Sequence, residues 1–390
     1  MTAPRLIFVV DHFALAVAGT ENQLVKMIPG LARDFAVELI CLRREGDWLE
    51  RRAREWNCRV LFFEIRNFKS PDAYLNWWRL VKHLRAAAPD VVHTFFPVSN
   101  IIGTLAARLA RVPNIVASRR DFGEWMNARY LTATKLANRC VDRIVTNSTL
   151  VKNLTNEVEH FPAEKIEVIL NGIDLAQMTK PEPQLELKSS LGIPADDDVV
   201  VLVANYRPMK RQITLVEAAS GVLKRRQNVS FLYVGKDYTP GKPLQTAVQR
   251  RSVDLGIANK VFYAHADGDV ARYLSFADIG VNCSHGEGIS NAIMEYMACG
   301  VPCVAAASGG NPDLVAHGTT GLLFECERPE QLADAIVQLL EKPSHGRELA
   351  ERARNMLSSR MSIDGMIDHF SRFYMGLIGS RASPTPANEL

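Results

Sequence analysis

The segment from Ile279 to Ala306, IGVNCSHGEGISNAIMEYMACGVPCVAA, decides the fold of this chain. Its two ends, 279–282 and 303–306, are short apolar runs of the kind that form buried strands. Between them, 291–298 has helical composition, and Pro302 prevents the helix from continuing. A strand, a helix and a second strand in this order indicate a parallel sheet covered by helices.

The same alternation extends through the rest of the chain. Further strand-like runs lie at 5–13, 36–42, 59–63, 91–94, 115–118, 144–147, 166–170, 199–203, 229–234, 261–263 and 321–324. Two prolines and mixed charges interrupt the alternation between 176 and 190. We therefore predict an α/β protein with two doubly wound Rossmann-like domains that face each other across a cleft. The predicted parts are an N-terminal domain at 1–177, a linker at 178–190, a C-terminal domain at 191–361 and, after a break at Ser358–Ser359, a terminal helix at 362–380 that packs back on the N-terminal domain.

The composition of the 390 residues, 47% hydrophobic and 23% charged, is that of a globular protein too long for one core. No apolar run approaches the roughly 20 residues that span a bilayer, and no signal segment begins the chain, so a cytoplasmic location is expected. The seven cysteines are scattered without a C-x-x-C pair. They favour free buried thiols over a disulfide framework or a zinc site.

The net charge of +3 is unevenly divided along the chain. Residues 1–177 carry 24 Lys and Arg against 19 Asp and Glu, whereas the remainder carries 22 against 24. The basic excess suits an anionic partner, such as a membrane surface or a phosphorylated acceptor, although a solvated surface explains it almost as well. Nucleic acid is not expected, because no recognition motif accompanies the excess.

Two glutamates flank the start of the predicted helix at 291–298. Glu287 lies in the loop that leads into the helix, and Glu295 lies about one turn inside, with its Cβ directed back toward that loop. Ser290 is placed to cap the helix and Gly300 to end it. The free N–H groups of the helix start suit a diphosphate, and the carboxylates suit sugar hydroxyls. The pattern predicts a nucleotide-sugar site, although two glutamates alone would more often be a loop cap and a surface charge.

The whole stretch resembles the E-x7-E signature of retaining glycosyltransferase family 4, in the form EG-x-x-N-x-x-x-E-x-MA-x-G-x-P. Two other segments are similar to that family, VTNSTLVKNLTNEVEHFPAEKIEVILNGID at 145–174 and GGNPDLVAHGTTGLLF at 309–324. The resemblance covers nearly the whole chain and is weakest from about residue 35 to 140. It implies the two-domain GT-B fold and transfer of a sugar from a nucleotide diphosphate sugar with retention of configuration. It implies no cofactor and no metal.

The resemblance also implies roles for matching residues of the second half. Glu295 would bind the ribose, and Glu287 would contact the hydroxyls of the transferred sugar. His285 would be a further polar group at the donor. Four neighbours would approach the phosphates and the sugar with their backbone: Gly288, Ile289, Ser290 and Asn291.

A loop cation completes the expected donor site. In VLVANYRPMKRQITLVEA at 201–218, Lys210 falls where the family places a pyrophosphate-binding lysine. Asn205 stands at the usual position of its partner arginine, and Arg207 is the candidate substitute. Fixed cations would stabilise the negative charge that grows on a departing nucleoside diphosphate. The candidate catalytic residues are Glu287, Lys210 and Arg207.

The first half matches the family only in part. Gly19 stands in the expected glycine-glycine-x-glutamate loop, where Ala18 replaces the first glycine. At 117–123, ASRRDFG, many family members have a histidine near the reacting sugar, and two arginines there would suit an anionic acceptor such as a phosphate-linked lipid. No nucleophile stands out, and the resemblance implies a front-face displacement. The candidate acceptor residues are His12, Arg119, Arg120 and Asp121.

Several other functions are disfavoured or left open. The D-x-D pattern at 267–269 resembles the manganese pair of other glycosyltransferase folds, but Asp269 is placed as a helix cap. A dehydrogenase would need G-x-G-x-x-G and a P-loop ATPase G-x-x-x-x-G-K-[ST], and the sequence has neither. Another GT-B-type sugar-nucleotide enzyme, such as an epimerase or phosphorylase, and a non-catalytic sugar-nucleotide-binding protein remain alternatives. The expected donor is a UDP sugar, with a GDP sugar second, and the expected acceptor is a glycan or lipid-linked molecule of the cell envelope.

The helix predicted at 74–87, YLNWWRLVKHLRAA, has two faces. Four residues should pack on the sheet: Trp77, Leu80, Val81 and Leu84. Trp78, Lys82 and Arg85 fall on the other face, which has the composition of an interfacial membrane anchor. Cover of a neighbouring loop by Trp78 would explain the pattern about equally well.

Overall fold

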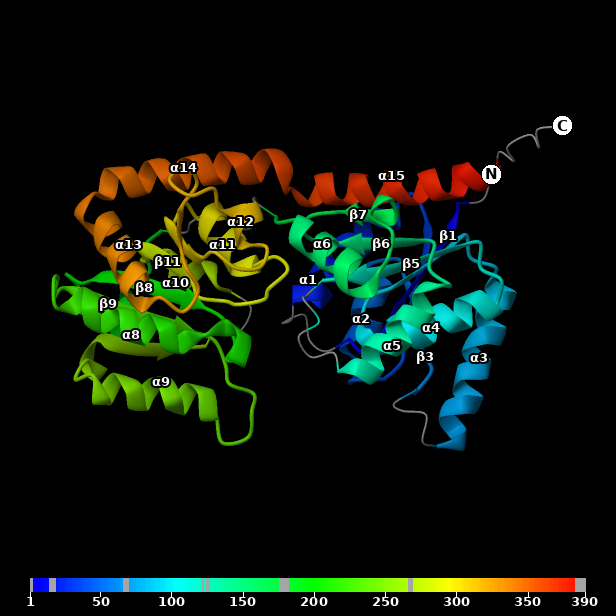
Figure 1. Cartoon of the computed structure of the whole chain (residues 1–390), viewed down its shortest axis with the longest axis horizontal. Coiled ribbons are helices and arrows are strands. Elements are labelled where there is room, and N and C mark those ends of the chain that lie inside the picture. The colour runs from blue at the N-terminus through cyan, green and yellow to red at the C-terminus, as the bar shows by residue number, and fades with distance from the viewer. Residues whose placement is uncertain are drawn as a thin grey trace. The chain divides into compact units, whose positions relative to one another are not determined.

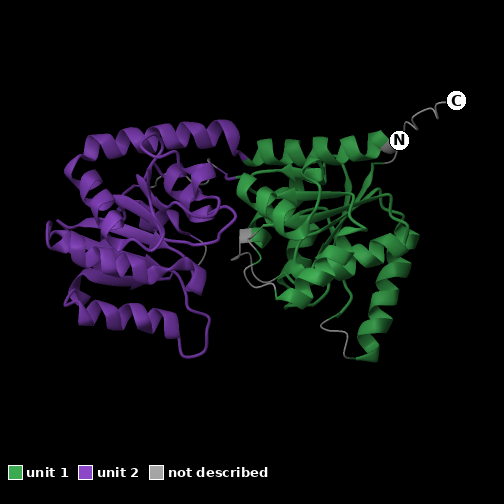
Figure 2. Ribbon diagram, viewed as in Figure 1, with its two compact units in different colours: residues 1–172, 363–390 green, residues 173–362 purple. Residues whose placement is uncertain are grey.

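The structure, a computed structural model, describes residues 3–13, 19–65, 70–120, 123, 127–174, 182–265 and 269–382. The chain forms two compact units, which Figure 2 shows in different colours. The first comprises residues 1–172 and 363–390, and the second comprises residues 173–362. Each unit is built on one parallel sheet, and each strand-like run of the sequence corresponds to a strand of these sheets.

The first unit contains a seven-stranded sheet in the order β3-β2-β1-β4-β5-β6-β7. Figure 1 labels β1, β3, β5, β6 and β7 of this sheet. Its strands are β1 (Arg5–Val10), β2 (Ala36–Cys41), β3 (Arg59–Phe62), β4 (Val91–Thr94), β5 (Asn114–Arg119), β6 (Arg143–Thr146) and β7 (Ile166–Val168). Its helices are α1 (Gly19–Leu31), α2 (Trp48–Glu55), α3 (Pro71–Ala87), α4 (Pro97–Leu109), α5 (Ala128–Asn138), α6 (Thr149–Glu159), the short 3-10 turn η1 (Ala163–Lys165) and α15 (Ile363–Ala382).

Alternate residues of β1 supply the two apolar layers of the first unit. Leu6 and Phe8 pack in the layer that also holds residues of α1, α2 and α15, whereas Ile7 and Val9 pack in the layer of α3 and α4. This division follows from the two-residue period of a strand. The terminal helix α15 therefore covers one face of the first sheet, although it follows the whole second unit in the sequence.

The second unit contains a six-stranded sheet in the order β10-β9-β8-β11-β12-β13. Its strands are β8 (Asp198–Val203), β9 (Val229–Val234), β10 (Val261–Ala264), β11 (Ile279–Asn282), β12 (Cys303–Ala306) and β13 (Leu322–Phe324). Its helices are α7 (Leu185–Ser190), α8 (Gln212–Leu223), α9 (Pro243–Asp254), α10 (Ala271–Leu274), α11 (Asn291–Ala298), α12 (Asn311–Leu314), α13 (Pro329–Glu341) and α14 (Pro343–Arg360), with the 3-10 turns η2 (Pro208–Lys210) and η3 (Ala258–Lys260).

Two boundaries differ from the sequence-based prediction. The units divide at Ile173, before the predicted linker at 178–190, of which 178–181 lie outside the described residues. The end of that linker is helix α7, which is fixed to the second unit because the Lys188 Nζ donates to the backbone oxygens of Ala195 and Asp197, each at 2.8 Å.

The predicted helix break at Ser358–Ser359 is wrong, because α14 continues to Arg360. The two serine hydroxyls donate to the backbone oxygens of Arg354 and Met356, at 2.9 Å each. Serine tolerates a helical position when its hydroxyl bonds to the preceding turn in this way.

We predict that Gly280→Ala destabilises the second unit. The added Cβ would lie 2.5 Å from the Tyr296 ring, and this ring cannot move easily because its buried hydroxyl bonds to the backbone of Val203 and Val281. Overpacking of this kind costs about 1–3 kcal/mol, which urea denaturation measures. Gly376→Ala on α15 is the control, since nothing lies within 4 Å of its Cβ. Equal stability of the two variants would contradict the prediction.

Candidate functional site

A buried polar network holds the loop between β11 and α11. The Nδ2 of Asn282 donates to the Ser290 Oγ at 2.8 Å, and the Asn282 Oδ1 accepts from the Ser284 N–H at 3.0 Å and the Asn311 Nδ2 at 3.2 Å. Helix α11 spans the residues predicted for it. Ser290 precedes the helix as predicted, but its hydroxyl makes no capping bond to the helix and bonds to Asn282 instead.

An ion pair between Lys210 and Glu287 lies at the centre of the candidate donor site. The Lys210 Nζ contacts the Glu287 Oε1, and both side chains are mostly buried, with 16% and 19% of their surface exposed. The Glu287 Oε2 is buried and has no hydrogen-bond partner among the described residues. The structure thus joins two of the three predicted catalytic residues, and it leaves one carboxylate oxygen able to accept a hydroxyl.

Backbone contacts fix the position of this ion pair. The His285 N–H donates to the Met209 oxygen at 2.7 Å and so ties the loop to η2, which carries Lys210. The Gly310 N–H donates to the Glu287 oxygen at 2.8 Å. Gly309 has a φ of +66°, and a Cβ there would lie 2.2 Å from the Glu287 oxygen. Only glycine fits this close approach of two loops.

The other predicted donor residues are close to Lys210 or Glu287 in the sequence, and their binding roles remain predictions. Gly288 and Ile289 are buried, whereas Glu295 in the second turn of α11 is partly exposed. His285 is exposed, and its Nδ1 lies 3.2 Å from the Ser308 Oγ. Arg207 is exposed at the start of η2.

Asn205, at the usual position of the partner arginine, has a structural role. Its Oδ1 accepts from the Lys236 N–H at 3.0 Å, and its backbone oxygen accepts from the Gln212 Nε2 at 3.1 Å. These bonds join the loops that follow β8 and β9.

Polar residues also gather where the strands of the first unit end. Asp11 caps α4, because its carboxylate accepts from the N–H groups of Val98 and Ser99 at 3.0 and 2.5 Å. His12 contacts the Arg43 Nη2 at 3.0 Å and stacks on Phe96. Gly19 is the first residue of α1, and Asp121 lies outside the described residues.

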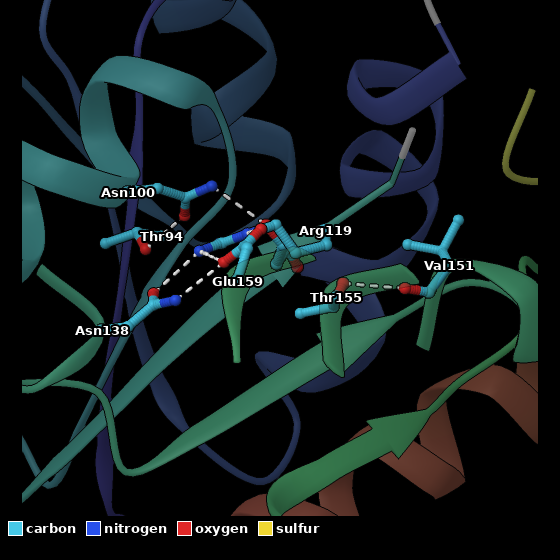
Figure 3. Close-up of polar contacts among 8 residues, drawn as sticks. Thr94, Asn100, Arg119, Asn138, Val151, Thr155 and Glu159 are labelled. Atoms are coloured by element: carbon cyan, nitrogen blue, oxygen red, sulfur yellow. Dashed lines mark hydrogen bonds and ion pairs between the residues drawn. The ribbon is translucent and has the colours of Figure 1, made fainter. Parts of the chain in front are cut away.

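Figure 3 shows that Arg119 is held in a buried ion pair. Its Nε and Nη2 donate to the two oxygens of Glu159 at 2.7 and 2.8 Å, and its Nη2 also donates to the Asn138 Oδ1 at 2.9 Å. The prediction that Arg119 binds an anionic acceptor is therefore not supported. Its charge is already neutralised, and a bidentate pair in this geometry fixes the end of β5 to α5 and α6.

Arg120 has different surroundings. Its Nη2 contacts the Asn171 Oδ1, and burial lowers the pKa of its guanidinium to about 10. His93 lies close enough for this charge to act on it, and burial together with Arg120 holds the pKa of His93 well below its usual value. The Tyr374 hydroxyl contacts the His93 Nδ1 at 2.7 Å, and burial raises the pKa of Tyr374 well above its usual value, so both rings are neutral near pH 7.

The described residues form neither a metal centre nor a membrane-spanning helix. No group of three or more His, Cys, Asp or Glu side chains in the described part of the chain is placed to hold a metal ion. Asp267 and Gly268 of the D-x-D pattern fall outside this part. None of the described helices is long and apolar enough to cross a membrane.

Comparison with known proteins identifies the family. The family model "Glycosyltransferase Family 4" matches residues 17–177, and "Glycosyl transferases group 1" matches residues 183–356. A D-inositol 3-phosphate glycosyltransferase from Actinosynnema mirum is 30% identical over 283 residues, which cover 68% of this chain and 67% of the relative. The chain belongs to glycosyltransferase family 4.

Other relatives of this family 4 glycosyltransferase match over different lengths. A D-inositol 3-phosphate glycosyltransferase from Mycobacteroides abscessus is 32% identical over 235 residues, covering 59% of this chain and only about half (52%) of the relative. An Escherichia coli UDP-Gal:alpha-D-GlcNAc-diphosphoundecaprenol alpha-1,3-galactosyltransferase is 24% identical and covers 88% and 90% of the two chains.

The solved structures establish the fold. Anabaena Alr3699/HepE in complex with UDP superposes with a TM-score of 0.84 at 21% identity, covering 95% of this chain and 100% of that one. The predicted fold class, two doubly wound Rossmann-like domains of the GT-B type, is confirmed.

Sequence reasoning missed several residues that hold the site together. Glu159 and Asn138, the partners of Arg119, lie 40 and 19 residues away from it and carry no local motif. Asn282 ends a buried strand of the 279–306 segment, and a polar side chain at that position signals a loop anchor. The glycine pair at 309–310 was noted only through the family resemblance.

We predict that Gly309→Ala abolishes the geometry of the Lys210–Glu287 pair and weakens the binding of UDP. The new methyl group would displace the Glu287 backbone, as the 2.2 Å approach requires. Gly318→Ala is a matched control, because Gly318 has a similar φ of +72° but no atom within 4 Å of its Cβ. Both variants carry the same backbone strain, so calorimetric titration with UDP isolates the steric effect. The same UDP affinity in both variants would show that the loop contact does not shape the site.

Proposed function

We propose that this family 4 glycosyltransferase transfers a sugar from a nucleotide diphosphate sugar, most simply a UDP sugar, to an anionic acceptor, with retention of configuration. The observation that carries the proposal is the Lys210–Glu287 ion pair beside the start of α11. The Lys210 ammonium suits a diphosphate. The Glu287 carboxylate suits sugar hydroxyls, because its Oε2 has no hydrogen-bond partner among the described residues. The names of the E. coli relative, which includes UDP-Gal, and of the Anabaena structure, which contains UDP, support the choice of donor base.

Donor binding would rearrange this ion pair. The diphosphate would take over Lys210, and Glu287 would then accept hydroxyls of the transferred sugar with both oxygens. The start of α11 adds backbone N–H groups and a positive dipole end near the phosphates. Arg207 would add a second cation from the same loop. In the transition state the leaving diphosphate gains negative charge, so cations fixed by η2 stabilise it more than the bound donor.

Retention requires the acceptor to attack from the side of the leaving group or through a covalent intermediate. We favour front-face attack, in which the leaving phosphate oxygen accepts the proton of the acceptor hydroxyl. The bond from the sugar to the phosphate oxygen breaks, and the bond to the acceptor oxygen forms on the same face. This step uses charges that the protein supplies through Lys210 and Arg207, and we propose that it needs no metal.

The acceptor is proposed to be a phosphorylated glycan or lipid-linked molecule. The names of three relatives contain anionic groups, namely D-inositol 3-phosphate, a diphosphoundecaprenol and L-malate. Residues 1–177, which include most of the first unit, have a basic excess, with 24 Lys and Arg against 19 Asp and Glu. A role in cell-envelope polysaccharide or glycolipid synthesis at the cytoplasmic face of a membrane follows from such an acceptor.

Helix α3 offers the surface for that membrane contact. Leu80, Val81 and Leu84 are buried as expected, whereas Trp78 is 51% exposed. Tyr74 and Leu75 on the same helix are also about half exposed, and Lys82 and Arg85 are exposed beside them. Aromatic rings with flanking cations suit the headgroup level of an anionic bilayer.

We predict that Lys210→Ala lowers turnover on the order of 100-fold, the usual effect of removing one preorganised charge contact to a transition state. Turnover is measured as UDP release from a panel of UDP sugars. Arg225→Ala is the control, because Arg225, just after α8, forms an exposed ion pair with Asp334 on α13. Unchanged turnover in a folded Lys210→Ala protein would remove the basis of the proposal, and loss of wild-type activity with a chelator would show that a metal supplies the charge.

We predict that the protein sediments with anionic vesicles at low salt and that Trp78→Ser with Lys82→Glu releases it. Each basic residue near an anionic surface contributes roughly 1 kcal/mol, so the attachment is weak and sensitive to salt. Arg225→Glu on the second unit is the charge-matched control. Wild-type protein that stays in solution, or a double variant that binds as well as wild type, rules out α3 as the contact.

A further inference from the structure

Arg119, the last residue of β5, and Arg120, which follows it, differ in how their charge is neutralised. Arg119 shares two hydrogen bonds with Glu159, whose side chain is 3% exposed. The Arg120 guanidinium contacts the neutral amide oxygen of Asn171 and, among the described residues, forms no ion pair with a carboxylate. Arg120 is therefore a partly buried cation without a counter-ion in the described part of the chain.

The groups around Arg120 are neutral as well. His93 is fully buried, and its two ring nitrogens contact the Tyr374 hydroxyl at 2.7 Å and the Ser118 Oγ at 2.9 Å. Burial raises the pKa of Tyr374 and lowers that of His93, so neither ring is charged near neutral pH. The described groups around Arg120 remove water without supplying a negative charge, which is unfavourable for a cation unless a ligand supplies that charge.

A second unsatisfied group lies beside Arg120. Asn147 is 3% exposed, and its Nδ2 donates to the Arg120 backbone oxygen at 3.4 Å. The Asn147 Oδ1 is buried and has no hydrogen-bond partner among the described residues. Arg120, Asn147 and Asn171 directly follow or lie just beyond the neighbouring strands β5, β6 and β7, at the carboxyl edge where ligands of open parallel sheets bind.

We propose that Arg120 binds the anionic group of the acceptor, a phosphate or a carboxylate, and that Asn147 accepts a hydroxyl of the same molecule. The inference rests on the proposed function and assigns its acceptor to named residues. Arg119 is a positioning residue, since its pair with Glu159 fixes the end of β5 from which Arg120 extends. A guanidinium presents two parallel N–H groups to phosphate or carboxylate, so removal of solvent around it favours binding of one such group.

The same anion chemistry could come from the diphosphate of the donor, and the test separates the two sources. Wild-type protein is first saturated with UDP, which fills the donor site, and is then titrated with inorganic phosphate while the melting temperature is recorded. A ligand that binds only the folded state raises this temperature. In a separate arm without phosphate, calorimetry measures the dissociation constant of UDP.

Arg120→Met is the main variant, and Arg139→Met, an exposed arginine that ends α5, is its control. The expected result is that phosphate binds UDP-saturated wild type and Arg139→Met equally, and binds Arg120→Met about 10- to 100-fold more weakly, as loss of a charged hydrogen-bond donor predicts. The dissociation constant of UDP stays within about twofold in all three proteins. Phosphate affinity that is the same in Arg120→Met and wild type, or absent in wild type, overturns the proposal.

Two further readouts guard against a merely structural role. Arg120→Met should melt no lower than wild type without ligand, because the substitution removes a cation that has no counter-ion among the described residues. A structural arginine would instead lower the melting temperature. Arg120→Lys should recover part of the phosphate affinity. A weaker affinity for UDP in Arg120→Met would assign the cation to the donor and overturn the acceptor role. If wild type binds phosphate but not UDP, the proposed donor is wrong. The phosphate affinities of wild type and Arg120→Met would still test the role of Arg120.

Discussion

Every strand of both sheets runs parallel to its neighbours, and this constraint places the chemistry of the chain. Parallel strands cannot be joined by tight hairpins, so each strand is followed by a loop at the carboxyl edge and then by a crossover. Arg120, Lys210 and Glu287 all lie after strands at such edges. Lys210 and Glu287, 77 residues apart, meet because β8 and β11 are neighbours in the second sheet.

The cations at these edges differ in their partners: Arg119 is in a buried ion pair, Lys210 is in a more exposed one, and Arg120 contacts neutral groups. This difference decides which of them can bind an anionic ligand. Arg119 is paired with Glu159 in a site with only 11% and 3% exposure, where removal of one partner typically costs 3–5 kcal/mol. Lys210 and Glu287 are paired but more exposed. A donor can separate this second pair if its diphosphate binds Lys210 and its sugar hydroxyls bind the released Glu287 carboxylate. Arg120 is held by neutral groups, so it gains a counter-ion only from a ligand or from residues outside the described part.

Local patterns in the sequence predicted the strands and α11 correctly. Contacts between residues on different elements, which shape the site, could not be predicted from these patterns. Each strand-like run forms a strand, and α11 spans 291–298 as expected, because burial and helix propensity act over a few residues. The role of Ser290 could not be derived in this way, since its partner Asn282 belongs to another element. The helix break at Ser358–Ser359 failed for a related reason. Serine disfavours a helix interior only slightly, and here both hydroxyls bond to backbone oxygens of the preceding turn while α14 continues.

The terminal helix joins the first unit through packing and through one polar contact. Phe370 and Met366 of α15 complete the apolar layer of β1 and α1, and the Tyr374 hydroxyl contacts a ring nitrogen of His93. Since the neutral imidazole has one donor and one acceptor nitrogen, both need partners when the ring is fully buried. Ser118 supplies one and Tyr374 the other. The environment of Arg120 therefore depends on Tyr374, which belongs to the first unit but follows the whole second unit in the sequence. Residues 1–172 alone could not predict this contact.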